Sequence, residues 1–83
     1  GFGNIYPNPT GGELNVDVIS TSKYDTRVLV YDVIGQSVFE KSTALIKGLN
    51  KLQFNFSFLA KGTYILHFAD DTGKTHVTKF VKD

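Results

Sequence analysis

The 83-residue sequence contains no cysteine, no methionine, no tryptophan and only two prolines. Without cysteine, disulfide cross-links, thiolate zinc sites and cysteine nucleophiles are all excluded. No run approaches the ~18 apolar residues that a membrane-spanning helix needs, and no signal peptide is visible, so we expect any such signal to belong to a longer parent protein. Nine Lys and Arg balance eight Asp and Glu. A chain without an excess of positive charge is a poor candidate for binding nucleic acid.

Aromatic and aliphatic residues are plentiful and alternate with polar ones. Hydrophobic residues make up 41% of the chain and aromatic residues 13%, more than a disordered segment carries. A single domain of this size buries roughly 63% of its unfolded surface. The alternation within 14–18, 52–58 and 64–68 predicts strands with one buried face, and places Phe54, Phe56 and Phe58 together in the core. The predicted strands are residues 4–6, 13–20, 26–33, 37–43, 50–57, 62–69 and 75–82.

Turn-forming residues separate these segments at short intervals. Residues 7–12 (PNPTGG) form a rigid turn, because neither proline can donate to a β-ladder. Gly35 and Gly73 supply the positive φ of two hairpin turns, 32–36 and 70–74. Seven short strands without a helical pattern predict an all-β fold, an immunoglobulin-like antiparallel β-sandwich of about seven strands.

One local motif indicates how the two sheets are joined. Leu59, Gly62 and Tyr64 have the spacing of a tyrosine corner, in which the phenol hydroxyl bonds to a backbone carbonyl a few residues upstream. Such a bond contributes about 1 kcal/mol to stability. We therefore interpret Tyr64 as structural.

The polar residues do not form a recognisable reaction centre. His67 and His76 lie on the strands of the last hairpin and could come near one another, but no third zinc ligand accompanies them. Asp70 and Asp71 suit turn chemistry better than metal binding. We expect no catalytic residue, no metal and no cofactor, and hence no enzyme. An exposed Tyr24 or Tyr31 could hold a sugar ring, which leaves carbohydrate binding open.

The order of the motifs resembles a known family, the C-terminal sorting domain of the Por, or type IX, secretion system of Bacteroidetes. The similar blocks are Ile5–Gly12 (IYPNPTGG), Val30–Val38 (VYDVIGQSV), Gly48 and Asn50, Leu59–Leu66 (LAKGTYIL), Asp71–Lys74 (DTGK) and Lys79–Lys82 (KFVK). Together they span residues 5–82. The resemblance implies a sorting domain over residues 4–83, with residues 1–3 as linker.

The resemblance also implies a function and a set of partners. Sorting domains of this family follow an N-terminal cargo domain, which crosses the inner membrane on its own signal peptide and folds in the periplasm. An outer-membrane translocon then recognises the sorting domain, and a sortase-like protease commonly removes it as the cargo is attached to the surface. The expected location is the periplasm in transit, then the cell surface or medium. The alternative is an immunoglobulin-like accessory or carbohydrate-binding module of a secreted enzyme.

The last hairpin, residues 62–82, is the expected recognition element. We expect it to present an open edge with Lys79 and Lys82 exposed, which the translocon reads by strand addition or by charge. The candidate recognition residues are Lys74, Lys79, Phe80, Val81 and Lys82. The residues expected to be structural are Pro7, Asn8, Pro9, Gly35, Gly62, Tyr64 and Gly73. Pro7, Asn8 and Pro9 are expected to keep an upstream cleavage segment extended.

Overall fold

The computed structural model describes all 83 residues and consists of seven strands joined by short turns. The strands are β1 (Phe2–Tyr6), β2 (Glu13–Ser20), β3 (Tyr24–Tyr31), β4 (Ser37–Leu45), β5 (Gly48–Asn55), β6 (Gly62–Ala69) and β7 (Thr75–Lys82). There is no helix that could cross a membrane. Three predicted strands have the observed bounds, and the others differ by a few residues. β1 begins at Phe2, so the strand includes residues that were expected to be linker.

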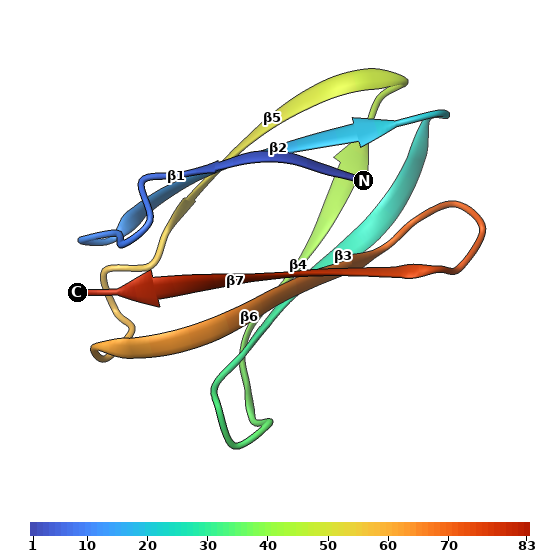
Figure 1. Cartoon of the computed structure of the whole chain (residues 1–83). Coiled ribbons are helices and arrows are strands. Elements are labelled where there is room, and N and C mark those ends of the chain that lie inside the picture. The colour runs from blue at the N-terminus through green and yellow to red at the C-terminus, as the bar shows by residue number, and fades with distance from the viewer.

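The strands form two antiparallel sheets packed face to face (Figure 1). One sheet, called sheet A, has the order β1-β2-β5, and the other, sheet B, has the order β4-β3-β6-β7. The predicted all-β antiparallel sandwich is confirmed. β3 lies in the interior of sheet B, between β4 and β6.

The core lies between the sheets and is built from the inward-facing residues of each strand. Its aromatic centre is a stack in which the Phe56 ring lies 5.4 Å from those of both Phe54 and Phe80. The prediction for Phe58 was wrong, because its side chain is 62% exposed. β5 ends at Asn55, so the strand alternation that would have buried Phe58 stops before it.

The tyrosine corner is present. The Tyr64 hydroxyl donates to the Ala60 carbonyl at 2.7 Å, and the ring is buried. Tyr64 lies near the start of β6, where the chain has passed from sheet A to sheet B. Gly62 opens this strand beside the Tyr64 ring, which a Cβ at position 62 would approach to 3.9 Å. The corner therefore fixes the crossing between the sheets.

Removing the Tyr64 hydroxyl is expected to cost stability without changing the fold. The Tyr64→Phe variant loses one part-buried hydrogen bond and leaves the Ala60 carbonyl without its partner, which lowers the free energy of unfolding by about 1 kcal/mol. Urea denaturation followed by circular dichroism measures the change. Tyr31→Phe is the control, since no hydrogen bond ties the Tyr31 hydroxyl. Equal stabilities for the two variants would contradict this role.

Candidate functional site

The structure divides the expected recognition residues of β7 between two faces. Lys79 and Val81 point outward, whereas Phe80 is fully buried in the core. The prediction that Lys82 is exposed was wrong, because this residue is only 8% exposed and its ammonium group donates to the Asp83 carbonyl at 2.8 Å. The cause is the period of two along a strand, which turns residues 80 and 82 inward. Phe80 and Lys82 are therefore unavailable to a partner while the domain is folded. Lys74 lies in the exposed turn before β7.

The loop between β1 and β2 covers part of the β7 edge. The Asn8 side chain accepts from the Val81 backbone N–H at 2.9 Å and donates to the Lys79 carbonyl at 3.3 Å. The Thr10 N–H donates to the Val81 carbonyl at 2.8 Å, and the Asp83 N–H donates to the Thr10 carbonyl at 2.9 Å. We call this pairing of residues 8–10 with residues 79–83 the clasp. It ties the first loop of sheet A to the last strand of sheet B.

The clasp limits strand addition at the edge of β7. Strand addition needs free backbone N–H and C=O groups along an edge. From Lys79 to Asp83 these groups are already bonded to Asn8 and Thr10. An incoming strand could pair only with the first half of β7.

Two residues of the PNPTGG turn hold the clasp in shape. Thr10 is completely buried, and its hydroxyl donates to the Glu13 carbonyl at 2.5 Å while accepting from the Gly12 N–H at 3.1 Å. The Gly12 carbonyl accepts from the Phe56 N–H at 2.8 Å. A Cβ at Gly12, whose φ is +156°, would lie 2.5 Å from Ser57 Oγ. Glycine is therefore required where this turn meets the start of the β5–β6 connection.

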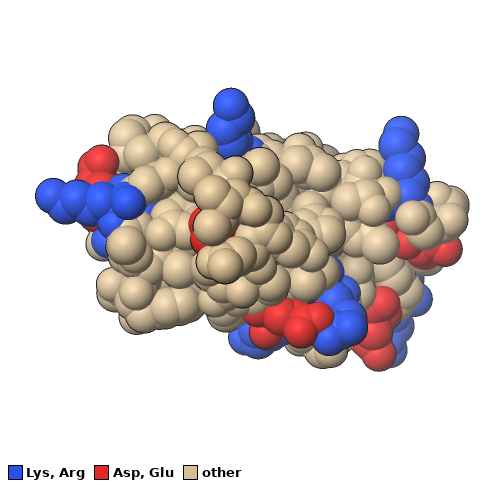
Figure 2. All heavy atoms as spheres, turned by 90° about the horizontal axis from the view of Figure 1, so that it is seen from below, with Lys and Arg blue, Asp and Glu red and all other residues tan.

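The outer faces of the two sheets differ in polarity. On sheet A, Gln53 donates to the Glu13 carboxylate at 2.7 Å, and Asn15 donates to the Tyr6 carbonyl at 3.2 Å. On sheet B the outward residues of three strands form a partly apolar face that also carries Asp25, Arg27, Thr63, Thr75 and Lys79. This apolar face consists of Leu29 and Tyr31 on β3, Ile65 and His67 on β6, and Val77 and Val81 on β7. Figure 2 views the molecule from this side and shows a broad uncharged surface with charged side chains mostly along its margins.

Tyr31 and His67 stack on each other within the apolar face. Their ring centroids are 4.8 Å apart, with an interplanar angle of 25°. One side of the Tyr31 ring, a residue considered for sugar binding, is thus covered. A shallow groove of about 650 Å³ adjoins the face, and Arg27, Leu29 and His67 are among its lining residues. The groove shares Leu29 and His67 with the apolar face, but most of its lining is polar and includes Asp25, Asp70 and Asp71.

The β6–β7 turn is organised by Asp70. Its carboxylate accepts from the Thr72 N–H at 2.9 Å, the Thr72 hydroxyl at 2.6 Å and the Lys74 N–H at 3.0 Å, and it contacts His76 Nε2 at 2.8 Å. The bond from the Thr72 hydroxyl, followed by that of His76, holds the pKa of Asp70 well below its ordinary value. The turn role predicted for Asp70 is confirmed. Gly73 has the positive φ of 87° that was predicted, as does Gly35 in the β3–β4 turn.

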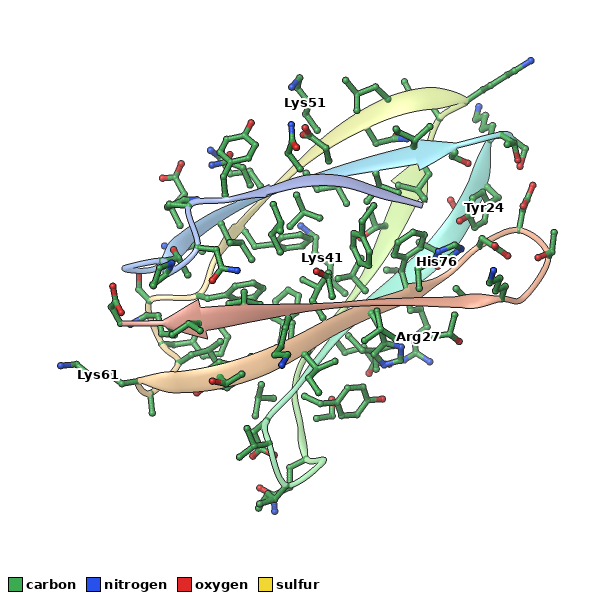
Figure 3. The ribbon with its side chains drawn as sticks, in the orientation of Figure 1. Tyr24, Arg27, Lys41, Lys51, Lys61 and His76 are labelled. Carbon is green, nitrogen blue, oxygen red and sulfur yellow. The ribbon has the colours of Figure 1, made fainter.

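The two histidines do not form a site. His67 pairs with Val77 and His76 pairs with Phe68, so the rings lie on opposite faces of the hairpin. The His76 ring stacks on Phe68 at 5.1 Å and lies at the same end of the sandwich as Tyr24 (Figure 3). Burial raises the pKa of Tyr24, and the charges of Asp71 and Asp70 add to the rise. No group of three His, Cys, Asp or Glu side chains could hold a metal ion.

Asp70 is expected to make the stability of the domain sensitive to acid. Because the pKa of Asp70 is lower in the folded state than in the unfolded chain, its contribution is complete above pH ~4 and is lost as the pH falls below that value. In Asp70→Asn this contribution is absent. The melting temperature of the variant should therefore fall less than that of the wild type between pH 6 and pH 3. Calorimetry at a series of pH values measures both melting temperatures. An equal fall in the wild type and in Asp70→Asn would contradict this role of Asp70.

Comparison with known proteins assigns the chain to a family. None of the curated proteins compared with the chain matches it. A family model described as the secretion system C-terminal sorting domain matches residues 4–83. This match covers all seven strands except the first two residues of β1, and the resemblance to a type IX sorting signal is confirmed. The chain belongs to the secretion system C-terminal sorting domain family.

Proposed function

We propose that this domain directs an N-terminally attached cargo protein through the outer-membrane translocon of the type IX system, and that a sortase-like protease then removes it. The domain acts as a signal and carries out no chemistry itself. The cargo passes through the periplasm and ends at the cell surface or in the medium. Membership of the sorting-domain family over nearly the whole chain is the observation that carries this proposal.

The clasp supports a signal that the translocon recognises only in the folded domain. The opening block around Pro7–Gly12 and the closing block at residues 79–83 are far apart in the chain but hydrogen-bonded in the structure. A surface that includes both blocks exists only after folding. The translocon would therefore recognise a shape, and a short C-terminal peptide would lack most of it.

The N-terminus, to which the cargo would be attached, lies at the end of the domain away from the clasp. The first residue pairs with Ile19, and a Cβ at Gly1 would lie 3.8 Å from His76 Nδ1. In Figure 1 this terminus lies at the opposite end of the sandwich from the C-terminus. Pro7, Asn8 and Pro9 lie at the clasp and not beside the N-terminus. The expectation that they keep an upstream cleavage segment extended is therefore revised, and we assign them to stiffening the clasp. A protease would reach the cargo junction at the end away from the clasp.

Export of a reporter tests the proposal. Residues 1–83 are fused behind a signal peptide and a fluorescent protein in a bacterium that carries the type IX system. Residues 1–3 are kept because Phe2 packs edge-on against Phe68 at 4.9 Å. We expect the reporter at the surface or in the medium, with a mass that lacks the domain. A reporter without residues 1–83 should stay in the periplasm, and equal export of both would overturn the proposal.

Deleting residues 74–83 is a poor negative control for this assay. The deletion removes all of β7, including the fully buried Phe80, and it also removes the clasp. Loss of export would then report unfolding as readily as loss of a signal. Single substitutions on the surface of the folded domain avoid this ambiguity.

A further inference from the structure

We infer that Asn55 is the acceptor for an N-linked saccharide, which a transferase attaches to its side-chain nitrogen before the chain folds. Residues 55–57 are Asn-Phe-Ser, and Asn-X-Ser with X other than proline is the acceptor pattern for this modification. We call residues 55–57 the acceptor sequence. The inference concerns a covalent modification of the domain and is independent of the machinery that exports it.

The spacing of an asparagine and a hydroxyl residue occurs at two places in the chain. Asn8-Pro9-Thr10 also has this spacing, but a proline in the middle position excludes transfer. The remaining asparagines have no serine or threonine two positions later. Asn55 is therefore the single candidate that the sequence offers.

The side-chain nitrogen of Asn55 is free to carry a substituent. β5 ends at Asn55, and both Asn55 and Ser57 are exposed. The Asn55 amide accepts hydrogen bonds through its oxygen, and its nitrogen donates none. In contrast, the side-chain nitrogens of Asn8, Asn15 and Asn50 all donate to backbone carbonyls. A saccharide on any of those three would break a hydrogen bond of the fold, whereas a saccharide on Asn55 breaks none.

The turn that contains the acceptor sequence can also accommodate the modified side chain. Asn55 Oδ1 accepts from the Ser57 backbone N–H at 3.0 Å and from the Ser57 hydroxyl at 2.6 Å. Because these bonds use the amide oxygen, a substituent on the nitrogen leaves them in place. A shallow hollow of about 270 Å³ adjoins the side chain and is lined by Glu13, Gln53, Phe54, Asn55 and Ser57. This hollow gives the first sugar ring both room and polar groups to contact.

The burial of Phe56 determines when the transfer takes place. Phe56 has no exposed surface, and its ring stacks on those of Phe54 and Phe80. A transferase that binds Asn-Phe-Ser as an extended segment would have to pull this ring out of the core. Loss of a buried phenylalanine ring costs about 3–5 kcal/mol. The acceptor sequence is therefore modified in the unfolded chain, and folding then fixes Asn55 at the surface.

The transfer uses a saccharide linked to a lipid pyrophosphate as its co-reactant. The Asn55 nitrogen attacks the anomeric carbon of the saccharide, so that a carbon–nitrogen bond forms and the bond from this carbon to the phosphate oxygen breaks. The lipid pyrophosphate leaves with the bonding electrons, and one amide proton passes to a base of the transferase. No group is oxidised or reduced. Ser57 supplies the hydroxyl that the acceptor pattern requires.

A saccharide on Asn55 would lie away from the cargo. Asn55 pairs with Glu13, and β5 ends on the same side of the molecule as the C-terminus, opposite the N-terminus (Figure 1). β5 is also an edge strand of sheet A. Because exposed edge strands pair readily with other chains, a bulky polar group at the end of β5 would hinder association between copies of the domain.

Mass spectrometry of the domain from the organism that produces it tests the inference. The precursor is taken from a strain without the outer-membrane translocon, so that the domain is still attached and the result does not depend on export. Trypsin releases residues 52–61 as one peptide, because Lys51 and Lys61 bound it. We expect this peptide to carry the added mass of a saccharide on Asn55. An unmodified peptide, or a saccharide on Ser57, would overturn the inference.

Substitutions in the acceptor sequence test the role of each group. Asn55→Gln and Ser57→Ala should lose the added mass, whereas Ser57→Thr keeps the hydroxyl and should retain it. Asn4→Gln is the matched control, because Asn4 is exposed and lies outside any acceptor sequence, and it should retain the added mass. Purified Ser57→Ala should melt within a few degrees of the wild type, so that its loss of the saccharide does not report misfolding. A saccharide that persists in Ser57→Ala would overturn the inference.

Discussion

The Phe80→Ala variant is expected to lose a large part of the stability of the domain. Phe80 has no exposed surface, and its ring stacks on those of Phe56 at 5.4 Å and Tyr64 at 5.6 Å. Replacing a buried phenylalanine by alanine costs about 3–5 kcal/mol. A domain of this size has a free energy of unfolding of about 4–12 kcal/mol. The substitution therefore removes a large part of the stability, and it also loosens the strand that the clasp holds.

Equilibrium urea denaturation measures this loss, with Phe58→Ala as the control. Phe58 is the same residue type, two positions beyond Phe56, but its side chain is 62% exposed. We expect its removal to cost less than about 1 kcal/mol, as for most surface substitutions. Similar midpoints for Phe80→Ala and Phe58→Ala would contradict the described core. In the export assay the Phe80→Ala reporter should reach the surface less well than the Phe58→Ala reporter.

The Thr10→Val variant is expected to open the clasp. Valine has nearly the shape of threonine but leaves the Gly12 N–H and the Glu13 carbonyl without the hydroxyl that both contact. Each buried group left unpaired costs about 1–3 kcal/mol, so the expected loss of stability for the two groups is about 2–6 kcal/mol. Because the Thr10 backbone is hydrogen-bonded to residues 81 and 83, the loss of stability should be largest at the C-terminal end of β7.

Hydrogen exchange distinguishes opening of the clasp from general destabilisation. In Thr10→Val the amide protons of Val81 and Asp83 should exchange faster than those in the middle of β6. Thr10→Ser keeps the hydroxyl and should retain most of the protection. Uniform acceleration across the domain would show that Thr10 acts on global stability alone. Unchanged exchange at Val81 would show that the clasp does not depend on the Thr10 hydroxyl.

Residue alternation and turn residues were sufficient to predict the fold. Gly35 and Gly73 marked the hairpin turns, and both have the expected positive φ. The spacing of Leu59, Gly62 and Tyr64 predicted the crossing between the sheets, because the tyrosine corner is a local motif with its acceptor four residues away. Phe58 shows the limit of this reasoning. Its alternation with Phe54 and Phe56 continued past the end of the strand, which local pattern does not mark.

The clasp could not be predicted from the sequence. Asn8 and Val81 are 73 positions apart, and a side chain that caps a distant strand edge leaves no periodic pattern. The burial of Lys82 was also not predicted, because lysine side chains are ordinarily exposed. In the structure the period of the strand turns Lys82 inward, where it lies beside Thr10. The apolar face could not be predicted from the sequence, because its residues come from three different strands. Only the register with β6 and β7 shows that one surface contains them all.

The most direct test of the sorting function is the surface fraction of the reporter carrying residues 1–83 in two strains that differ only in the outer-membrane translocon. With the translocon, the reporter should be at the surface or in the medium. Without it, the same reporter should stay in the periplasm with the domain still attached. Equal amounts of surface reporter in the two strains would contradict the account, because the domain would then be exported without the machinery that is proposed to read it.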